Sequence, residues 1–201
     1  MKELFLNNSI NLLNKQYNYD NDTLDKVKYG LEVIYIILTK TTVILIISII
    51  FNTFKETILT MIFVNFLRIF AYGLHAKKSW HCYISSIFAF IIAPMFFTNL
   101  ELVLYQKIVI FIATLLSFIL FAPADTYKRP LVNDRHRKKL KIETILVAII
   151  YITLCFIIKN NYIVNLLILS LIIESIIINP FIYKIFGLSY DNYKSYKKAC
   201  N

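Results

Sequence analysis

A short stretch of the chain brings a thiol and two imidazole groups close together in sequence. His75 and Cys82 stand seven residues apart, and His81 directly precedes the cysteine. A cysteine is a strong nucleophile as the thiolate, and a histidine within about 3 to 4 Å can take up the thiol proton and stabilise the resulting charge. His75 and Cys82 are therefore the predicted catalytic pair, and the predicted chemistry is nucleophilic.

A turn between two helices would bring this pair within reach. On one straight helix the two residues would lie about 10.5 Å apart along the axis, too far for direct proton transfer. Gly73 can instead end one helix and Ser79 can cap the next, which leaves His75 in the turn and Cys82 in the first helical turn. Backbone N–H groups exposed there favour the thiolate, as do the two lysines before Ser79.

Other interpretations of this segment stay open at the level of the residues. Cys82 can be a small residue at the membrane interface and His75 a solvated loop residue, because the spacing alone is a weak signal. His81 is less suited as the base, since adjacent residues on a helix point about 100° apart. A metal site at these three residues would lack a fourth ligand nearby, so no metal and no other cofactor is predicted.

The composition predicts an all-α, polytopic integral membrane protein with about six transmembrane helices. Hydrophobic residues make up 58% of the 201-residue chain and charged residues 17%. A helix needs about 20 largely apolar residues to span a bilayer, so the two 17-residue stretches are short. The apolar stretches run over about 31–54, 58–74, 80–98, 102–122, 142–158 and 162–186.

The distribution of charge predicts the orientation of these spans. The chain has 22 Lys and Arg against 12 Asp and Glu, a net charge of +10. Seven of the basic residues fall in the loop 123–141, which the positive-inside rule places in the cytoplasm together with both termini. In so hydrophobic a chain the excess charge indicates topology in the cell membrane and contact with anionic lipids, and it argues against nucleic-acid binding.

A single membrane domain, 1–201, is expected, with residues 1–30 forming an amphipathic segment on the cytoplasmic face. Apolar residues of this segment recur at helical spacing, as on a helix that lies in the membrane surface. A helix packed on the cytoplasmic loops would show the same pattern.

Proline and glycine mark predicted bends and ends of the helices. Pro94 and Pro180 fall inside predicted spans and should kink them. All three glycines of the chain fall at predicted span edges, where helix ends favour glycine: Gly30, Gly73 and Gly187.

Four charged residues lie inside predicted spans, where a charge is costly: Lys40, Arg68, Lys107 and Glu174. Lys107 is near a span end and can extend to the interface. Lys40 is a candidate ion-pair partner of Glu174. Arg68 differs from these residues because it precedes His75 by about two helical turns.

The segment around the predicted pair resembles the accessory gene regulator protein B (AgrB) family of bacterial membrane cysteine endopeptidases. Arg68, Gly73, His75-Ala76 and Cys82 have the order and spacing of that family, in which the catalytic histidine precedes the cysteine by seven residues.

A second stretch resembles the same family. Ala122-Pro123-Ala124-Asp125 is followed by Lys128-Arg129-Pro130 and a basic run, which is similar to the family's proline-containing Lys/Arg loop. The length near 200 residues, the span count and the cytoplasmic termini also agree. The chain departs from the family at Tyr72-Gly73, where two glycines are common, which affects the detail of the turn but not the catalytic pair.

The resemblance implies a cysteine endopeptidase of quorum-sensing signal production. Cys82 would attack a peptide bond near the C-terminal side of a small AgrD-like precursor, with His75 as the base, and form an acyl-enzyme. A cysteine or serine of the precursor would then take the acyl group and release a thiolactone or lactone autoinducing peptide. The precursor and membrane lipids are the expected partners, and the resemblance also allows a homodimer. The implied substrate-binding or supporting residues are Arg68, Gly73, Ser79, Asp125, Lys128 and Arg129.

The group that orients His75 or stabilises the oxyanion is not identified by the sequence. Candidates on the same predicted face of the membrane are Asp125, Ser79, Asn133 and the backbone N–H of Cys82. A structural role is an equally good interpretation for each side chain.

Two other functions compete with the peptidase. In a small membrane transporter or peptide exporter, the charged residues inside the spans would line a path and Cys82 would be incidental. In a membrane-anchored lipid-binding scaffold, the basic loop 123–141 would hold anionic lipid. Substitution of Cys82 or His75 separates the first of these from the peptidase, because only the peptidase needs both residues.

Overall fold

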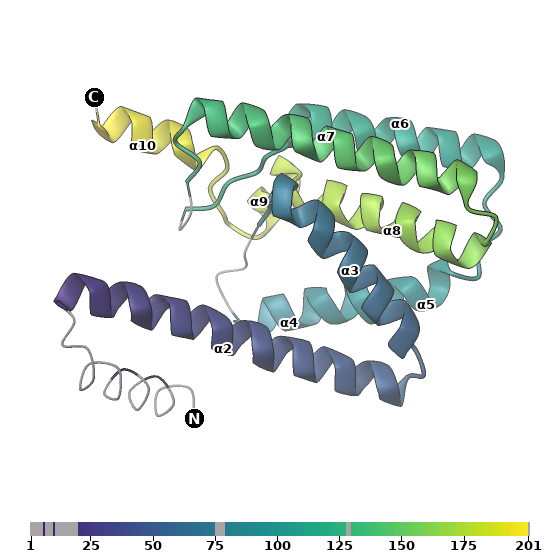
Figure 1. Ribbon diagram of the computed structural model, residues 1–201, viewed down its shortest axis with the longest axis horizontal. Coiled ribbons are helices and arrows are strands. Elements are labelled where there is room, and N and C mark those ends of the chain that lie inside the picture. The colour runs from purple at the N-terminus through teal and green to yellow at the C-terminus, as the bar shows by residue number, and fades with distance from the viewer. Residues whose placement is uncertain (1–5, 7–9, 11–19, 75–78, 128–129, 201) are drawn as a thin grey trace. The chain divides into compact units, whose positions relative to one another are not determined.

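The computed structural model describes residues 6, 10, 20–74, 79–127 and 130–200 of the chain (Figure 1). The chain divides into two compact units, Met1–Ile47 and Ser48–Asn201. The described residues form helices and no β-strand, which confirms the predicted all-α class. The helices are α2 (Asn21–Ile50), α3 (Phe54–Ala71), α4 (Ser79–Ile87), the π-helical turn η1 (Phe88–Ile92), α5 (Ala93–Phe97), α6 (Leu104–Phe121), α7 (Asp134–Ile157), α8 (Asn161–Ile177), α9 (Pro180–Ile185) and α10 (Asn192–Cys200).

In the first unit, α2 begins earlier than the sequence predicts. The helix runs from Asn21 without a break, so residues 21–30 continue into the first predicted span. Of the residues before it, Leu6 and Ile10 are helical and most others lie outside the described part. Gly30 lies inside α2, so its predicted place at a helix end is wrong. A glycine inside a helix costs about 1 kcal/mol, which is less than the cost of starting a new helix.

In the second unit, α8 is the central helix of a bundle. All residues from Val164 to Leu171 are buried, and α8 contacts α3, α5, α6 and α7. A helix that is apolar all round is stable where other helices surround it. Figure 1 shows α6 and α7 side by side along α8. Large apolar side chains on the outer sides of α6 and α7 are exposed, including Val109, Leu120 and Ile150.

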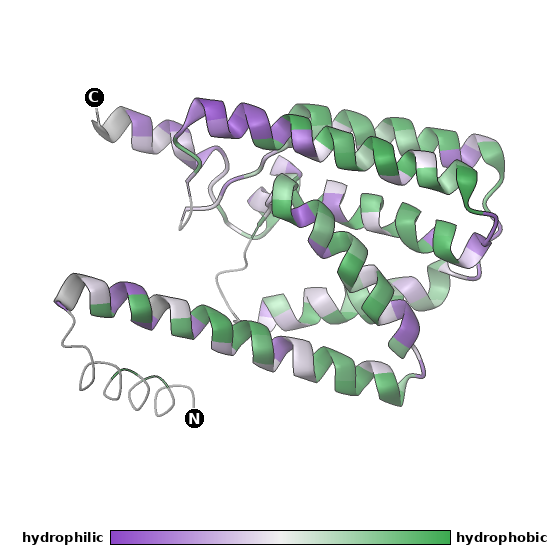
Figure 2. Ribbon diagram, viewed as in Figure 1, coloured by the Kyte–Doolittle hydropathy of each residue, from purple (hydrophilic) through white to green (hydrophobic). Residues whose placement is uncertain are grey.

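Four helical segments are long and apolar enough to cross a membrane: Thr23–Ile50, Trp80–Phe97, Leu104–Phe121 and Asp134–Ile157. A further apolar helix, α8, is shorter. α3 is not among the four, and it carries Lys55, Glu56 and Arg68. Figure 2 shows that α6 and the second half of α7 are hydrophobic, whereas the start of α7 is hydrophilic. The chain is thus a helical membrane protein, and the six-span count and the cytoplasmic termini stay predictions.

Proline divides the last predicted span, 162–186, into two helices. α8 ends at Ile177, and α9 begins at Pro180. Proline has no N–H to continue the helix, and the residue before a proline avoids helical dihedrals. Asn179 accordingly has φ −71° and ψ 129°, and its side chain accepts the N–H of Phe181 at 2.9 Å. The predicted kink at Pro180 is therefore an interruption of the helix.

At Pro94 the helical path continues without an interruption. The π-helical turn η1 directly precedes α5, in which Pro94 occupies one of the first two positions. A π-helical turn shifts the hydrogen-bond register and so accommodates the missing N–H of proline. The predicted span 80–98 therefore consists of α4, η1 and α5 in sequence.

Candidate functional site

The end of α3 forms a strained turn directly before the predicted catalytic histidine. Tyr72 has φ 62° and Gly73 has φ 121°, so the backbone leaves the helix through the left-handed region. A Cβ on Gly73 would lie 2.5 Å from Cγ2 of Ile177 on α8. Both the dihedral angle and the close approach require glycine here. The predicted helix end at Gly73 is confirmed, since α3 ends at Ala71.

The loop after α6 holds this turn by backbone hydrogen bonds. The N–H of Gly73 donates to the carbonyl of Ala124 at 2.9 Å, and the N–H of Ala124 donates to the carbonyl of Ala71 at 3.0 Å. Tyr72 and Ala124 thus form an isolated parallel bridge. The two stretches that carry the family resemblance are 50 residues apart in sequence and lie side by side in space.

Arg68 spans the same turn from the last part of α3. Its Nη2 donates to the carbonyl of Leu74 at 2.7 Å. Hydrogen bonds from a charged donor are stronger than neutral ones, so this contact fixes the peptide that leads to residue 75. Arg68 is implied as a substrate-binding or supporting residue, and this contact is consistent with a supporting role.

Several of the predicted site residues lie outside the described part of the chain. These are His75 with Lys77 and Lys78, and also Lys128 and Arg129 of the basic loop. The backbone of Ser79 is described as the first residue of α4, and its side chain is not. The predicted contact of His75 with Cys82 therefore stays a prediction.

Cys82 lies in the first turn of α4, as predicted, and is partly exposed. The first turn of a helix carries backbone N–H groups that have no partner within the helix, and these favour a thiolate. The ring of His81 lies 3.8 Å from that of Trp80 and 5.9 Å from that of Phe186, measured between centroids. These contacts place the start of α4 beside the end of α9, and they keep the His81 ring among aromatic rings.

Asp125 is buried and fully engaged with the backbone. Its side chain is 3% exposed. Oδ1 accepts the N–H of Asn192 at 2.9 Å, and Oδ2 accepts the N–H groups of Tyr193 at 2.8 Å and Leu131 at 3.3 Å. A carboxylate at a helix N-terminus satisfies free N–H groups and interacts favourably with the helix dipole. Asp125 therefore caps α10, and its carboxylate oxygens hold structural contacts.

Asn133 is also a helix cap. Its side-chain oxygen accepts the N–H groups of Arg135 at 3.0 Å and His136 at 3.3 Å at the start of α7. Asp125 and Asn133 are both candidates from the sequence for orienting the predicted catalytic histidine. In the structure the side chains of both residues cap helices.

Glu174 on α8 lies directly beneath the strained turn. It is 0% exposed, and in the described part of the chain neither carboxyl oxygen has a hydrogen-bond partner. Oε1 is 3.7 Å from the position that a Cβ of Gly73 would occupy, and Arg68 is the basic residue whose charge acts on this carboxyl. Lys40, the candidate ion-pair partner from the sequence, belongs to the other compact unit, so this pairing stays a prediction.

Tyr183 on α9 holds the backbone of the loop after α6. Its hydroxyl donates toward the carbonyls of Ala124 at 3.4 Å and Asp125 at 3.2 Å. It also lies within electrostatic range of Arg68, Asp125 and Glu174. The sequence does not predict a role for Tyr183 at this site, because its hydrogen-bond partners are more than 50 positions away in the chain.

The start of α7 and the segment around α10 line a basic groove of about 500 Å³. The guanidinium of Arg137 lies 3.2 Å above the ring of Tyr193. The Tyr190 hydroxyl donates to the carbonyl of Phe121 at 3.1 Å, and burial raises the pKa of this phenol, so that it stays a neutral donor. The lining residues are Leu120, Phe121, Ala122, Pro123, Asp134, Arg137, Lys138, Lys141, Pro180, Tyr190, Asp191, Tyr193 and Lys194.

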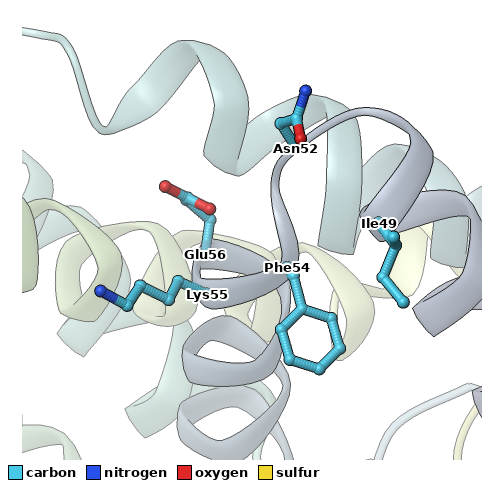
Figure 3. A pocket seen from close by; sticks show the side chains of 5 residues that line it. All are labelled: Ile49, Asn52, Phe54, Lys55 and Glu56. Carbon is cyan, nitrogen blue, oxygen red and sulfur yellow. The ribbon is translucent and has the colours of Figure 1, made fainter.

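A smaller hollow of about 350 Å³ lies at the turn between α2 and α3 (Figure 3). It is lined by Ile49, Asn52, Phe54, Lys55 and Glu56. The turn is at the opposite end of α3 from Arg68, about 21 Å along the helix. None of its lining residues is a predicted site residue, and no group of three or more metal-ligating side chains occurs among the described residues.

The fold and the braced turn before Cys82 define a polytopic helical membrane protein with a cysteine at the start of a helix. The chain belongs to the accessory gene regulator B family, whose pattern matches residues 6–178. It is 33% identical over 187 residues to an AgrB-like protein of Clostridium acetobutylicum, which covers 93% of this chain and 90% of the relative.

Two further relatives show the same relationship. An AgrB-like protein of Listeria innocua is 33% identical over 178 residues, covering 89% of this chain and 87% of the relative. The accessory gene regulator protein B of Staphylococcus carnosus is 35% identical over 150 residues, covering 75% and 78%. No solved structure matches the chain.

Proposed function

We propose that this protein is a membrane cysteine endopeptidase that cleaves a small signal-peptide precursor and generates a thiolactone or lactone autoinducing peptide. One observation carries the proposal: the chain is held firmly on both sides of the segment 75–78. Arg68 and Ala124 fix the turn before it, and α4 begins directly after it with Cys82 in the first turn. Such an arrangement restricts where His75 can lie relative to the thiol.

The first half of the reaction forms an acyl-enzyme. Sγ of Cys82 attacks the carbonyl carbon of the scissile peptide, and His75 accepts the thiol proton. The C–N bond then breaks, and His75 returns the proton to the leaving amine. The product is a thioester between Cys82 and the N-terminal part of the precursor.

The second half transfers the acyl group within the precursor. A cysteine or serine side chain of the precursor attacks the thioester carbon, the bond to Cys82 breaks, and the thiol of Cys82 regains a proton. Exchange between two thioesters is nearly isoenergetic, whereas hydrolysis would lose the activation of the acyl group. The site must therefore exclude water, and the aromatic contacts at the start of α4 support such exclusion.

The basic groove is the proposed contact for the precursor's acidic C-terminal part. Arg137, Lys138 and Lys141 line the groove, and opposite charge would orient the precursor. Lys128 and Arg129 belong to the same basic loop. Ser79 is the first residue of α4 and not the residue before it, so it would support the start of the helix three residues before Cys82. The amphipathic N-terminal segment would meet the precursor's leader at the cytoplasmic membrane surface, where lipids and a second copy of the chain are further proposed partners.

Intact mass spectrometry tests the proposal. The full chain in nanodiscs is mixed with a candidate precursor peptide, and we expect a covalent adduct on the wild type. Cys82→Ala and His75→Ala should give no adduct, while Cys155→Ala should retain it, because the Cys155 thiol is buried and faces the carbonyl of Val164. Bound precursor without adduct or cleavage would contradict the peptidase and favour a transporter or exporter.

A further inference from the structure

Glu174 occupies an unusual environment for a carboxyl group. It is completely buried in the central helix α8, and Ile173 and Leu171 beside it are buried as well. Neither oxygen has a hydrogen-bond partner among the described residues. A buried polar group without a partner opposes folding, so a residue of this kind is expected where it serves a function.

The position of the carboxyl is defined by the strained turn. Oε1 lies 3.7 Å from the place of a Cβ on Gly73, and only a hydrogen is present there. Cγ2 of Ile177, about one helical turn after Glu174, lies 2.5 Å from the same Cβ position. The missing side chain of Gly73 thus gives the carboxyl direct access to the backbone two residues before His75.

Arg68 binds the peptide that leads to residue 75 and lies within electrostatic range of this carboxyl. One arm of its guanidinium binds the carbonyl of Leu74 at 2.7 Å. Its charge also acts on Glu174. A guanidinium has five N–H donors in a planar fork, so it can serve a carbonyl and a carboxyl together.

We propose that Glu174 is a positioning residue of the peptidase site: with Arg68 it fixes the Gly73–Leu74 turn and thereby the orientation of His75 toward Cys82. This inference rests on the proposed function. Glu174 does not need to touch the substrate in this role. Its effect reaches the thiol through Arg68, the turn and the histidine, so it should alter the reactivity of Cys82 more than the stability of the fold.

Alkylation by iodoacetamide measures this reactivity without the precursor. The rate at Cys82 of the full chain in nanodiscs is followed by peptide mass spectrometry at a fixed neutral pH. Glu174→Gln keeps the size of the side chain and replaces the carboxyl by an amide, and we expect the rate to fall about tenfold, as for a shift of one pKa unit of the thiol. His75→Ala should lower the rate at least as much. Glu174→Asp retains the carboxyl and should restore part of the rate.

Ser170→Ala is the matched control. Ser170 is polar, fully buried and one turn earlier on α8, and its hydroxyl donates to the carbonyl of Leu166 in the same helix. We expect this variant to alkylate at the wild-type rate. Arg68→Gln combined with Glu174→Gln should be no slower than the slower single variant, because both act through one contact.

The outcomes separate this inference from the proposed function. If His75→Ala slows alkylation and Glu174→Gln behaves like Ser170→Ala, the role of Glu174 is refuted and the catalytic pair stands. If neither His75→Ala nor Glu174→Gln changes the rate, both proposals fail. Thermal unfolding reports whether each variant is folded, and if Glu174→Gln does not fold, a folded Glu174→Leu variant that is alkylated at the wild-type rate would refute the role.

Discussion

Two buried carboxyl groups lie at the same end of the helical bundle and have opposite surroundings. Asp125 accepts three backbone N–H groups, whereas Glu174 has no hydrogen-bond partner in the described part of the chain. The sequence singles out both residues, Asp125 as a possible catalytic group and Glu174 as a charge inside a span. The contacts make Asp125 a structural cap, and Glu174 is the residue for which we propose a positioning role.

The difference shows how a carboxyl's role can be judged from its partners. Saturated hydrogen bonds to backbone N–H groups fix a carboxylate in one place and occupy its oxygens. A buried carboxyl without partners is a cost that packing elsewhere must offset. Substitutions at the two sites should therefore have different effects on stability.

Removal of the Asp125 carboxylate should have the largest effect. In Asp125→Ala the N–H groups of Asn192, Tyr193 and Leu131 lose their acceptor, two of them at the start of α10. We expect a loss of about 3 to 5 kcal/mol of unfolding free energy, measured by thermal unfolding in detergent. Asp134→Ala, which removes an exposed partner of Lys197, is the control and should leave the midpoint nearly unchanged. Equal midpoints for both variants would contradict the capping role.

Substitution of Gly73, in the turn beside Glu174, should have the next largest effect on stability. Gly73→Ala combines a φ of 121° with a contact of 2.5 Å to Ile177, and we expect a loss of about 2 to 3 kcal/mol. The same substitution at Gly30 meets nothing within 4 Å inside a helix and should stabilise the protein by about 1 kcal/mol. Circular dichroism melts of both variants measure these changes. If both substitutions shifted the free energy of unfolding in the same direction, this would be evidence against the strained turn.

Replacement of Glu174 should act on stability in the opposite direction from Asp125. Glu174→Leu puts an apolar side chain of similar size where a carboxyl lacks partners. We expect the free energy of unfolding to stay equal or to rise by about 1 kcal/mol, while the alkylation rate of Cys82 falls. A melting midpoint as low as that of Asp125→Ala would show that Glu174 is a structural residue after all.

The hydroxyl of Tyr183, which lies within electrostatic range of both carboxyl groups, should contribute little to stability. Tyr183→Phe removes a hydroxyl whose distances to the carbonyls of Ala124 and Asp125 are long, at 3.4 and 3.2 Å. We expect a loss of about 0.5 to 1 kcal/mol in the same melts. Tyr105→Phe, at an exposed position, is the control and should not change the midpoint. A loss several times larger would mean that Tyr183 couples the two groups.

The long apolar stretches predict most of the helices because membrane spans are set by composition and length. The segments around 102–122 and 142–158 correspond to α6 and to the second part of α7. The sequence is less informative where single residues decide the path. It places Gly30 at a helix end and expects a kink at Pro180, whereas the helix continues through the first and stops before the second.

The candidate site is predicted in part. The order of Arg68, Gly73 and Cys82 is sufficient to predict a helix end, a turn and a new helix. The contacts of Asp125 with Asn192 and Tyr193, and the position of Glu174 beside Gly73, are not predictable in this way, because these residues come from segments more than 60 residues distant in the chain. Contacts over such separations depend on how the helices pack, and the spacing of residues does not contain that information.

The cap on α10 has a practical consequence for protein engineering. The family match ends at residue 178, before α9 and α10, yet these helices supply Tyr183 and two of the three N–H groups around Asp125. A truncation designed at that boundary would uncover the loop that holds Gly73. Reporter fusions should accordingly follow α10, so that the last helix keeps its place against the loop.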